Sequence, residues 1–94
     1  MFSISVNEKG IIVLTGRLDA AQVERAREVF SGLDDSAVVD FQNLDYISSA
    51  GLGVLLATQQ RLKKGGKAIK LVHMNRMVRD VFKIARFDLI FEIE

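Results

Sequence analysis

Two consecutive hydroxyl side chains, Ser48 and Ser49, stand between an apolar segment and a run of leucines. From Asp45 to Leu56 the chain reads Asp-Tyr-Ile-Ser-Ser-Ala-Gly-Leu-Gly-Val-Leu-Leu, which predicts a strand that leads directly into a helix. The first turn of a helix presents unpaired N–H groups and the positive end of the helix dipole, and both favour a phosphate group. A hydroxyl at this place can therefore serve as a chemical switch.

The two hydroxyls are predicted to have different roles. If Ser48 is the N-cap, its oxygen accepts a hydrogen bond from a first-turn amide, and Ile47 packs on Leu52 as a hydrophobic staple. Ser49 is then the first helical residue, and its hydroxyl stays accessible outside the helical hydrogen bonds. Capping accounts for one serine, so regulation is the interpretation of the other.

Gly51 and Gly53 lie inside the predicted helix, where glycine costs about 1 kcal/mol relative to alanine. Two explanations are open for the missing side chains. The helix packs closely on the sheet, which we favour, or a partner's backbone approaches the helix closely.

Apolar periodicity predicts the elements that position this segment. Residues 2–6 alternate, Asn7-Glu8-Lys9-Gly10 offers a turn, and residues 11–15 are apolar, which together indicate a β-hairpin. The expected elements after it are a helix capped by Asp19 with Gln22 completing a capping box, a strand over 37–41, the helix opened by the serines and stopped by Gly65-Gly66, a strand over 68–72, a helix capped by Asn75, and a closing strand over 89–93.

Each helix is expected to turn an apolar stripe inward. The inward residues are Val23, Ala26, Val29, Phe30 and Leu33 in the first helix, Leu52, Leu55, Leu56 and Leu62 in the second, and Met77, Val78, Val81, Phe82 and Ala85 in the third. The order β-β-α-β-α-β-α predicts one α/β domain over residues 1–94. Its sheet is mixed and four- to five-stranded, with crossover helices between parallel strands and an antiparallel initial hairpin.

Composition narrows the function classes. The 94 residues carry 13 basic and 12 acidic side chains, so no strong field attracts nucleic acid or an anionic membrane. The longest nearly apolar run, residues 50–57, is far shorter than the roughly 20 residues of a membrane span. Cysteine is absent and the first residues alternate like a strand, so we expect no disulfide, no signal peptide and a cytoplasmic protein that binds other proteins.

Three segments together resemble the STAS domain, and most of all the stand-alone anti-sigma factor antagonists of bacteria. They are Gly16-Arg17-Leu18-Asp19, the stretch from Leu44 to Leu55, and Gly65-Gly66 before an apolar strand. The resemblance covers essentially the whole chain. It implies a binding protein rather than an enzyme, with no cofactor.

The resemblance also implies a partner and a switch. In the family, the unmodified protein captures an anti-sigma factor that is also a serine kinase of the histidine-kinase ATPase type, and phosphorylation breaks the complex. By this resemblance Ser49 is the phosphoacceptor, a serine phosphatase reverses the modification, and the protein is a monomer or weak dimer. The expected interface comprises the exposed side of the serine-opened helix together with Asp19, Ser48, Ser49, Gly51 and Leu52.

Two positions depart from the family pattern. Phosphorylated members commonly have an acidic residue before the acceptor serine, whereas this chain has Ser48, so either serine remains a candidate acceptor. Arg17 stands where an acidic or neutral residue is often found. It is expected to form a surface ion pair with Asp19, or to contact a partner or the phosphate.

Other conspicuous residues are interpreted as structural. His73 is the only histidine, which excludes a multi-histidine metal site and makes a catalytic triad improbable. Basic residues on the last helix are expected to form a solvated face. The alternative function is an unswitched assembly subunit of a lipid-transport or signalling complex, which would use the same surface without needing a modifiable hydroxyl.

Overall fold

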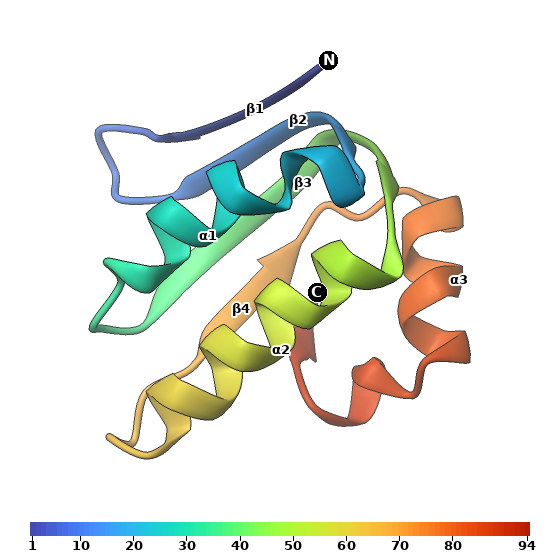
Figure 1. The fold of residues 1–94 in the computed structure, drawn as a ribbon. Coiled ribbons are helices and arrows are strands. Elements are labelled where there is room, and N and C mark those ends of the chain that lie inside the picture. Colours follow the sequence, from blue (N-terminus) through green and yellow to red (C-terminus); the bar gives the residue numbers. More distant parts are fainter.

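The computed structural model describes all residues from Met1 to Glu94 and contains a single five-stranded sheet with three α-helices (Figure 1). The elements are β1 (Phe2–Val6), β2 (Ile12–Leu18), the 3-10 helix η1 (Ala20–Gln22), α1 (Val23–Ser31), β3 (Ala37–Ile47), α2 (Ser49–Lys63), β4 (Ile69–Val72), α3 (Arg76–Ile84), the 3-10 helix η2 (Phe87–Leu89) and β5 (Glu92–Ile93). This order confirms the predicted α/β class and the alternation of strands and helices.

The strands follow one another across the sheet in the order β1-β2-β3-β4-β5. The hairpin strands β1 and β2 are antiparallel, whereas β2, β3, β4 and β5 are mutually parallel neighbours. Parallel neighbours require crossover connections, and α1, α2 and α3 provide them. The predicted mixed sheet with an antiparallel initial hairpin is therefore confirmed.

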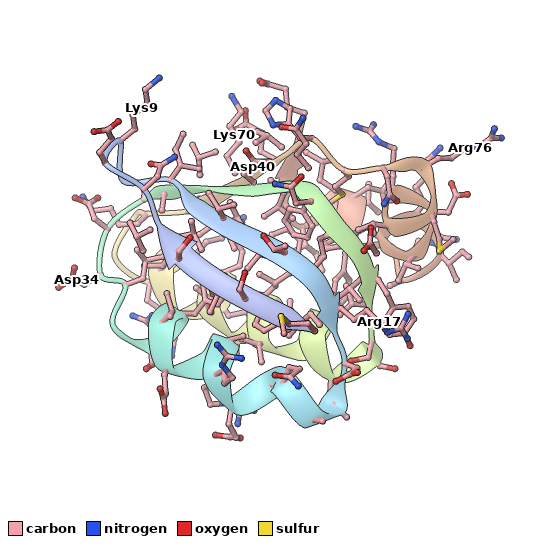
Figure 2. All side chains as sticks on the ribbon, turned by 90° about the horizontal axis from the view of Figure 1, so that it is seen from above. Lys9, Arg17, Asp34, Asp40, Lys70 and Arg76 are labelled. Carbon is pink, nitrogen blue, oxygen red and sulfur yellow. The ribbon has the colours of Figure 1, made fainter.

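Helices α1 and α2 lie side by side over one face of the sheet, and α3 lies beside the end of β3 (Figure 1). The labelled Asp40 and Lys70 lie on the opposite side of the sheet from α1 (Figure 2). Between the sheet and the helices is one cluster of 21 buried apolar residues. Within this cluster the Phe82 ring of α3 makes edge-to-face contacts with Phe41 and Phe91, each with ring centroids 5.9 Å apart.

Two strands are longer than predicted. The strand expected over residues 11–15 continues to Leu18, and the strand expected over 37–41 continues to Ile47. The β2–β3 register shifts twice along this stretch, and each shift places an extra residue in β3. Such bulges interrupt the alternation of apolar and polar residues that marks a strand in sequence. The consequence is that β3 runs directly into Ser48.

The start of the first helix also differs from the prediction. Asp19 caps the 3-10 helix η1, its Oδ1 accepting from Ala21 N–H at 3.2 Å, and α1 begins only at Val23. Gln22 returns no side-chain hydrogen bond to Asp19, so the expected capping box is not formed. The short 3-10 turn tightens the path from β2 into α1.

Six residues of the predicted inward stripes are not fully buried: Met77 is exposed, and Val29, Leu33, Leu56, Val81 and Ala85 are half-buried. Met77 is 64% exposed because Val78 and Phe82 are the residues of α3 that face the core, and successive helical residues differ by about 100° in direction. Leu56 is only half-buried for the same reason, since its neighbour Leu55 is the one that points into the core.

The closing strand is shorter than the predicted span 89–93. Residues Phe87–Leu89 form η2, and only Glu92 and Ile93 pair with β4, opposite Lys70 and Leu71. None of the helices combines the length and the apolar character that crossing a bilayer would require.

Candidate functional site

Ser48 fastens the junction between β3 and α2. Its backbone N–H donates to Leu18 O at 2.9 Å, its Oγ accepts from Gly51 N–H at 3.2 Å, and its carbonyl accepts from Leu52 N–H at 2.9 Å. The residue has extended backbone geometry, with φ −90° and ψ 170°, as an N-cap requires. The predicted capping role of Ser48 is confirmed, and its oxygen is already occupied by the helix.

Ser49 is the first residue of α2, and it is exposed. Its hydroxyl takes part in none of the side-chain hydrogen bonds of the structure, while the capping bond beside it is made by Ser48. The first-turn amides and the positive end of the dipole of a 15-residue helix lie beside it. An accessible hydroxyl is therefore held where an attached phosphate would be electrostatically favoured.

Gly51 and Leu52 lie beneath this helix start. A Cβ on Gly51 would come within 2.9 Å of Ile47 Cγ1 and of Leu18 Cγ, which confirms close packing of the helix on the sheet as the reason for this glycine. Leu52 is 7% exposed and joins the core cluster together with Ile47. These two predicted interface residues thus support the site from below and present little of their own surface.

Asp19 reaches the same place from the neighbouring strand. Leu18, the last residue of β2, accepts the Ser48 N–H bond, so half-buried Asp19 follows at the carboxyl end of β2 where β3 also ends. The structure therefore brings Asp19, Ser48 and Ser49 to one end of two parallel strands. This edge is where parallel α/β sheets commonly bind their ligands.

Arg17 does not form the expected ion pair with Asp19. Its guanidinium carbon lies 4.3 Å from the centroid of the Tyr46 ring, a cation–π geometry. The reason is the strand register, which pairs Arg17 with Tyr46 and Leu18 with Ile47. Sequence reasoning missed this contact because residues 17 and 46 become neighbours only through the irregular β2–β3 pairing.

A groove of about 210 Å³ runs between α1 and α2, and we call it the α1–α2 groove. It is lined by Arg27, Phe30, Ser31, Gly53, Val54, Ala57, Thr58 and Arg61. Gly53 lies one helical turn after Ser49. Apart from its chain neighbours and the backbone of its own helix, no atom lies within 4 Å of the position that a Cβ on Gly53 would take. Packing therefore explains Gly51 but gives no reason for Gly53.

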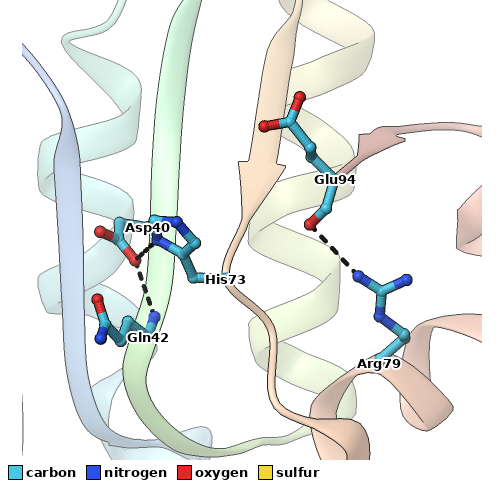
Figure 3. Close-up of polar contacts among 5 residues, drawn as sticks. All are labelled: Asp40, Gln42, His73, Arg79 and Glu94. Atoms are coloured by element: carbon cyan, nitrogen blue, oxygen red, sulfur yellow. Dashed lines mark hydrogen bonds and ion pairs between the residues drawn. The ribbon is translucent and has the colours of Figure 1, made fainter.

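His73 lies on the uncovered side of the sheet, at the end of β4. Its Nδ1 is 3.1 Å from Asp40 Oδ1, which also accepts from the backbone N–H of Gln42 at 2.9 Å (Figure 3). In a separate contact, Arg79 donates to the Glu94 carbonyl at 3.3 Å (Figure 3). His73 has a positive φ of 62°, and its side chain contacts Asp40 of β3. No serine side chain is among the hydrogen-bond partners of His73.

Comparison with known proteins identifies relatives of the whole chain. The family model described as "Mlab, STAS domain" matches residues 4–92. BtrV of Bordetella bronchiseptica, named as an anti-sigma factor antagonist, is 34% identical over 82 residues, which cover 87% of this chain and 70% of BtrV.

Solved structures share the fold at lower identity. An anti-sigma factor antagonist from Mycobacterium paratuberculosis superposes with a TM-score of 0.82 at 16% identity, over 99% of this chain and 83% of that one. The Bacillus cell fate determinant SpoIIAA in its phosphorylated form gives a TM-score of 0.71 at 21% identity, over 100% of this chain and 91% of that one. Unphosphorylated SpoIIAA, an anti-sigma factor antagonist, gives 0.70 at 21% identity, over 100% and 87%.

Proposed function

The chain belongs to the STAS domain family, and from this membership we propose that it is an anti-sigma factor antagonist switched by phosphorylation of Ser49. In its unmodified form it binds a serine-kinase anti-sigma factor of the histidine-kinase ATPase type, which releases the sigma factor. Phosphorylation ends the binding, and a serine phosphatase restores it. The role is supported by the name of BtrV, and the switch by the existence of SpoIIAA in two phosphorylation states.

The observation that carries this proposal is the free, exposed Ser49 hydroxyl at the start of α2. Ser48 is the weaker candidate because its oxygen already accepts from Gly51 N–H and its side chain is half-buried. A phosphate on Ser48 would remove the N-cap hydrogen bond of α2. A phosphate on Ser49 disturbs no hydrogen bond of the fold and gains the field of the helix dipole.

The switch acts on binding and leaves the fold intact. Phosphorylation adds a charge of about −1.5 to −2 in the middle of the surface that includes Asp19 and the exposed side of α2. A partner that fits the neutral hydroxyl must then desolvate the phosphate without a counter-charge. A cost of about 3 kcal/mol weakens the complex roughly a hundredfold.

The modification is tested by incubating the purified chain with ATP and, in turn, each serine-kinase anti-sigma factor that the host genome encodes. Intact-mass analysis should show one added phosphate with one of these kinases, and fragment masses should place it on Ser49. Ser49→Ala should abolish the mass shift, whereas Ser48→Ala should retain it. A shift that persists in Ser49→Ala and disappears in Ser48→Ala would assign the switch to Ser48 instead.

An unswitched assembly subunit of a lipid-transport or signalling complex is the second candidate. One observation favours it: Ser48 stands where phosphorylated members of the family commonly carry an acidic residue. In this case no host kinase modifies the chain, and Ser49→Asp binds its partner as tightly as the unmodified protein. A kinase-type anti-sigma factor or transporter components encoded next to the gene would also separate the two candidates.

A further inference from the structure

The residues that line the α1–α2 groove include two arginines and no acidic residue. Its lining contains the guanidinium groups of Arg27 and Arg61 and the hydroxyls of Ser31 and Thr58, but no carboxylate. Helix α2 has no acidic residue from Ser49 to Lys63, and it carries basic residues in its last turn. Arg27 on the α1 side is paired with Glu24, so an anionic group that enters the groove is attracted mainly by Arg61 on the α2 side.

Arg61 is the cation that the fold has positioned there. Its Nη2 donates to Phe30 O at 2.7 Å, which ties the guanidinium to the last turn of α1. None of the ion pairs of the structure includes Arg61, whereas Arg27 is paired with Glu24. A guanidinium has five N–H donors, so Arg61 keeps donors free for a carboxylate in a fixed orientation.

Gly53 and Ala57 have small side chains, so the side of the groove formed by α2 has free space above it. Both residues are exposed, and the space above Gly53 is empty to 4 Å from its would-be Cβ. Glycine at this helical position costs stability that no packing contact recovers. A second helix can approach α2 closely at Gly53, and the buried residues Phe30 and Thr58 also line the groove.

We propose that the α1–α2 groove receives a glutamate or aspartate side chain from a helix of the protein partner, with the carboxylate bound by Arg61. The proposal rests on the function proposed above, because it extends the same partner-binding surface along α2. Gly53 lies one turn from Ser49, and Arg61 lies about 18 Å from Ser49 along the helix axis. The partner thus contacts a switch at one end of α2 and an anchor at the other.

The groove is tested without the natural partner by a synthetic helical peptide. An alanine-based peptide of about 20 residues, long enough to be helical alone, carries glutamate at every seventh position, which avoids like charges four residues apart, and its control carries lysine instead. Titration of the ¹⁵N-labelled chain with the glutamate peptide should shift the amide signals of Gly53, Ala57, Thr58 and Arg61 saturably. The lysine peptide should not shift them.

Substitutions test whether peptide binding depends on the Arg61 guanidinium and on the free space at Gly53. Arg61→Gln should weaken binding of the glutamate peptide about tenfold, since a charge-assisted hydrogen bond is lost, while Lys64→Gln outside the groove lining should not. Gly53→Leu should also weaken binding about tenfold by filling the groove, whereas Gln60→Leu on the same helix should not. Circular dichroism of all four variants should give the spectrum of the native chain, which controls for loss of the fold.

The proposal is overturned if the glutamate peptide does not bind, if the lysine peptide binds equally, or if Arg61→Gln leaves the peptide affinity unchanged. The same variants in a binding assay with the kinase distinguish this failure from that of the proposed function. Phosphorylation at Ser49 together with an unchanged kinase affinity of Arg61→Gln overturns the groove alone. Peptide binding without any kinase that modifies Ser49 supports the groove and contradicts the proposed function.

Discussion

Ser48 and Ser49 are adjacent in the chain, yet their side chains have separate tasks. The Ser48 oxygen is committed to the Gly51 N–H, and the Ser49 oxygen is committed to nothing in the chain. A residue that holds the helix cannot be modified without a loss of stability. A residue that holds nothing can be modified without changing the fold.

Because Ser48 caps α2 and Ser49 makes no side-chain hydrogen bond, their alanine variants should differ in stability. Ser48→Ala should lower the free energy of unfolding by about 1 kcal/mol, because the N-cap acceptor is lost. Ser49→Ala should change it by less than about 0.5 kcal/mol, the usual range of a surface substitution. Urea unfolding followed by circular dichroism measures both, and an equal loss in the two variants would contradict the assignment of the cap to Ser48.

The two glycines of α2 should respond in opposite directions to alanine. Gly51→Ala should destabilise the fold by about 1–3 kcal/mol, because the new Cβ lies 2.9 Å from Ile47 Cγ1 and from Leu18 Cγ. Gly53→Ala should stabilise it by up to about 1 kcal/mol, since the Cβ meets no atom within 4 Å. Thermal unfolding of both variants is the measurement. A rise in the melting temperature of Gly51→Ala would show that the helix start has room to move.

At the scale of elements, the long strand β3 determines where the site lies. It delivers Ser48 to the end of β2, where Leu18 O accepts the Ser48 N–H, and Asp19 follows Leu18. The sequence indicated a strand only to Phe41 because the two bulges in β3 break the period of two. The location of the serines relative to Asp19 therefore depends on the irregular β2–β3 pairing, which cannot be predicted from local periodicity.

Other parts of the architecture were accessible from sequence. Ser48 and Asn75 were identified as caps because a short polar side chain preceded an apolar helical period, and both accept the first-turn hydrogen bond, Asn75 from Val78 N–H at 2.8 Å. The parallel order of the sheet followed from strands that alternate with helices. The different reasons for Gly51 and Gly53, and the stacking of Arg17 on Tyr46, depend on contacts between distant segments and could not be inferred.

The connections that precede β3 and β4 are joined by an exposed ion pair between Lys67 and Asp35. The hydrogen bond from Ser36 N–H, together with Lys67 Nζ at 3.1 Å, lowers the pKa of Asp35 below its ordinary value of 3.8. Because the pKa is lower in the folded chain, the stabilisation is present above pH 3.8 and is lost as the pH falls through the folded value.

Between about pH 5 and pH 2 the urea midpoint of the native chain should therefore fall, and it should fall less steeply in Asp35→Asn. The pKa of Glu94 is lowered in the same direction by Lys70, so part of the acid loss should remain in the variant. Equal slopes for the native chain and Asp35→Asn would show that Asp35 is not coupled to folding.

At the scale of the whole molecule, β2, β3 and α2 together form the proposed partner-binding surface around Ser49. This surface continues into the α1–α2 groove. The core beneath it holds Leu18, Ile47 and Leu52 in place, so the helix start is rigidly positioned. A small chemical change at one exposed hydroxyl can then alter recognition while the core remains unchanged. This separation of a rigid support from a modifiable contact is the physical basis of the proposed switch.

The most direct test is the affinity of one host anti-sigma kinase for the chain before and after modification, measured by isothermal titration with the Ser49 phosphoprotein and the unmodified protein. We predict that phosphorylation weakens the complex about a hundredfold or more, that Ser49→Asp weakens it in the same direction, and that Ser49→Ala binds like the unmodified chain. Equal affinity of the phosphorylated and unmodified proteins for the kinase would contradict the switch at Ser49.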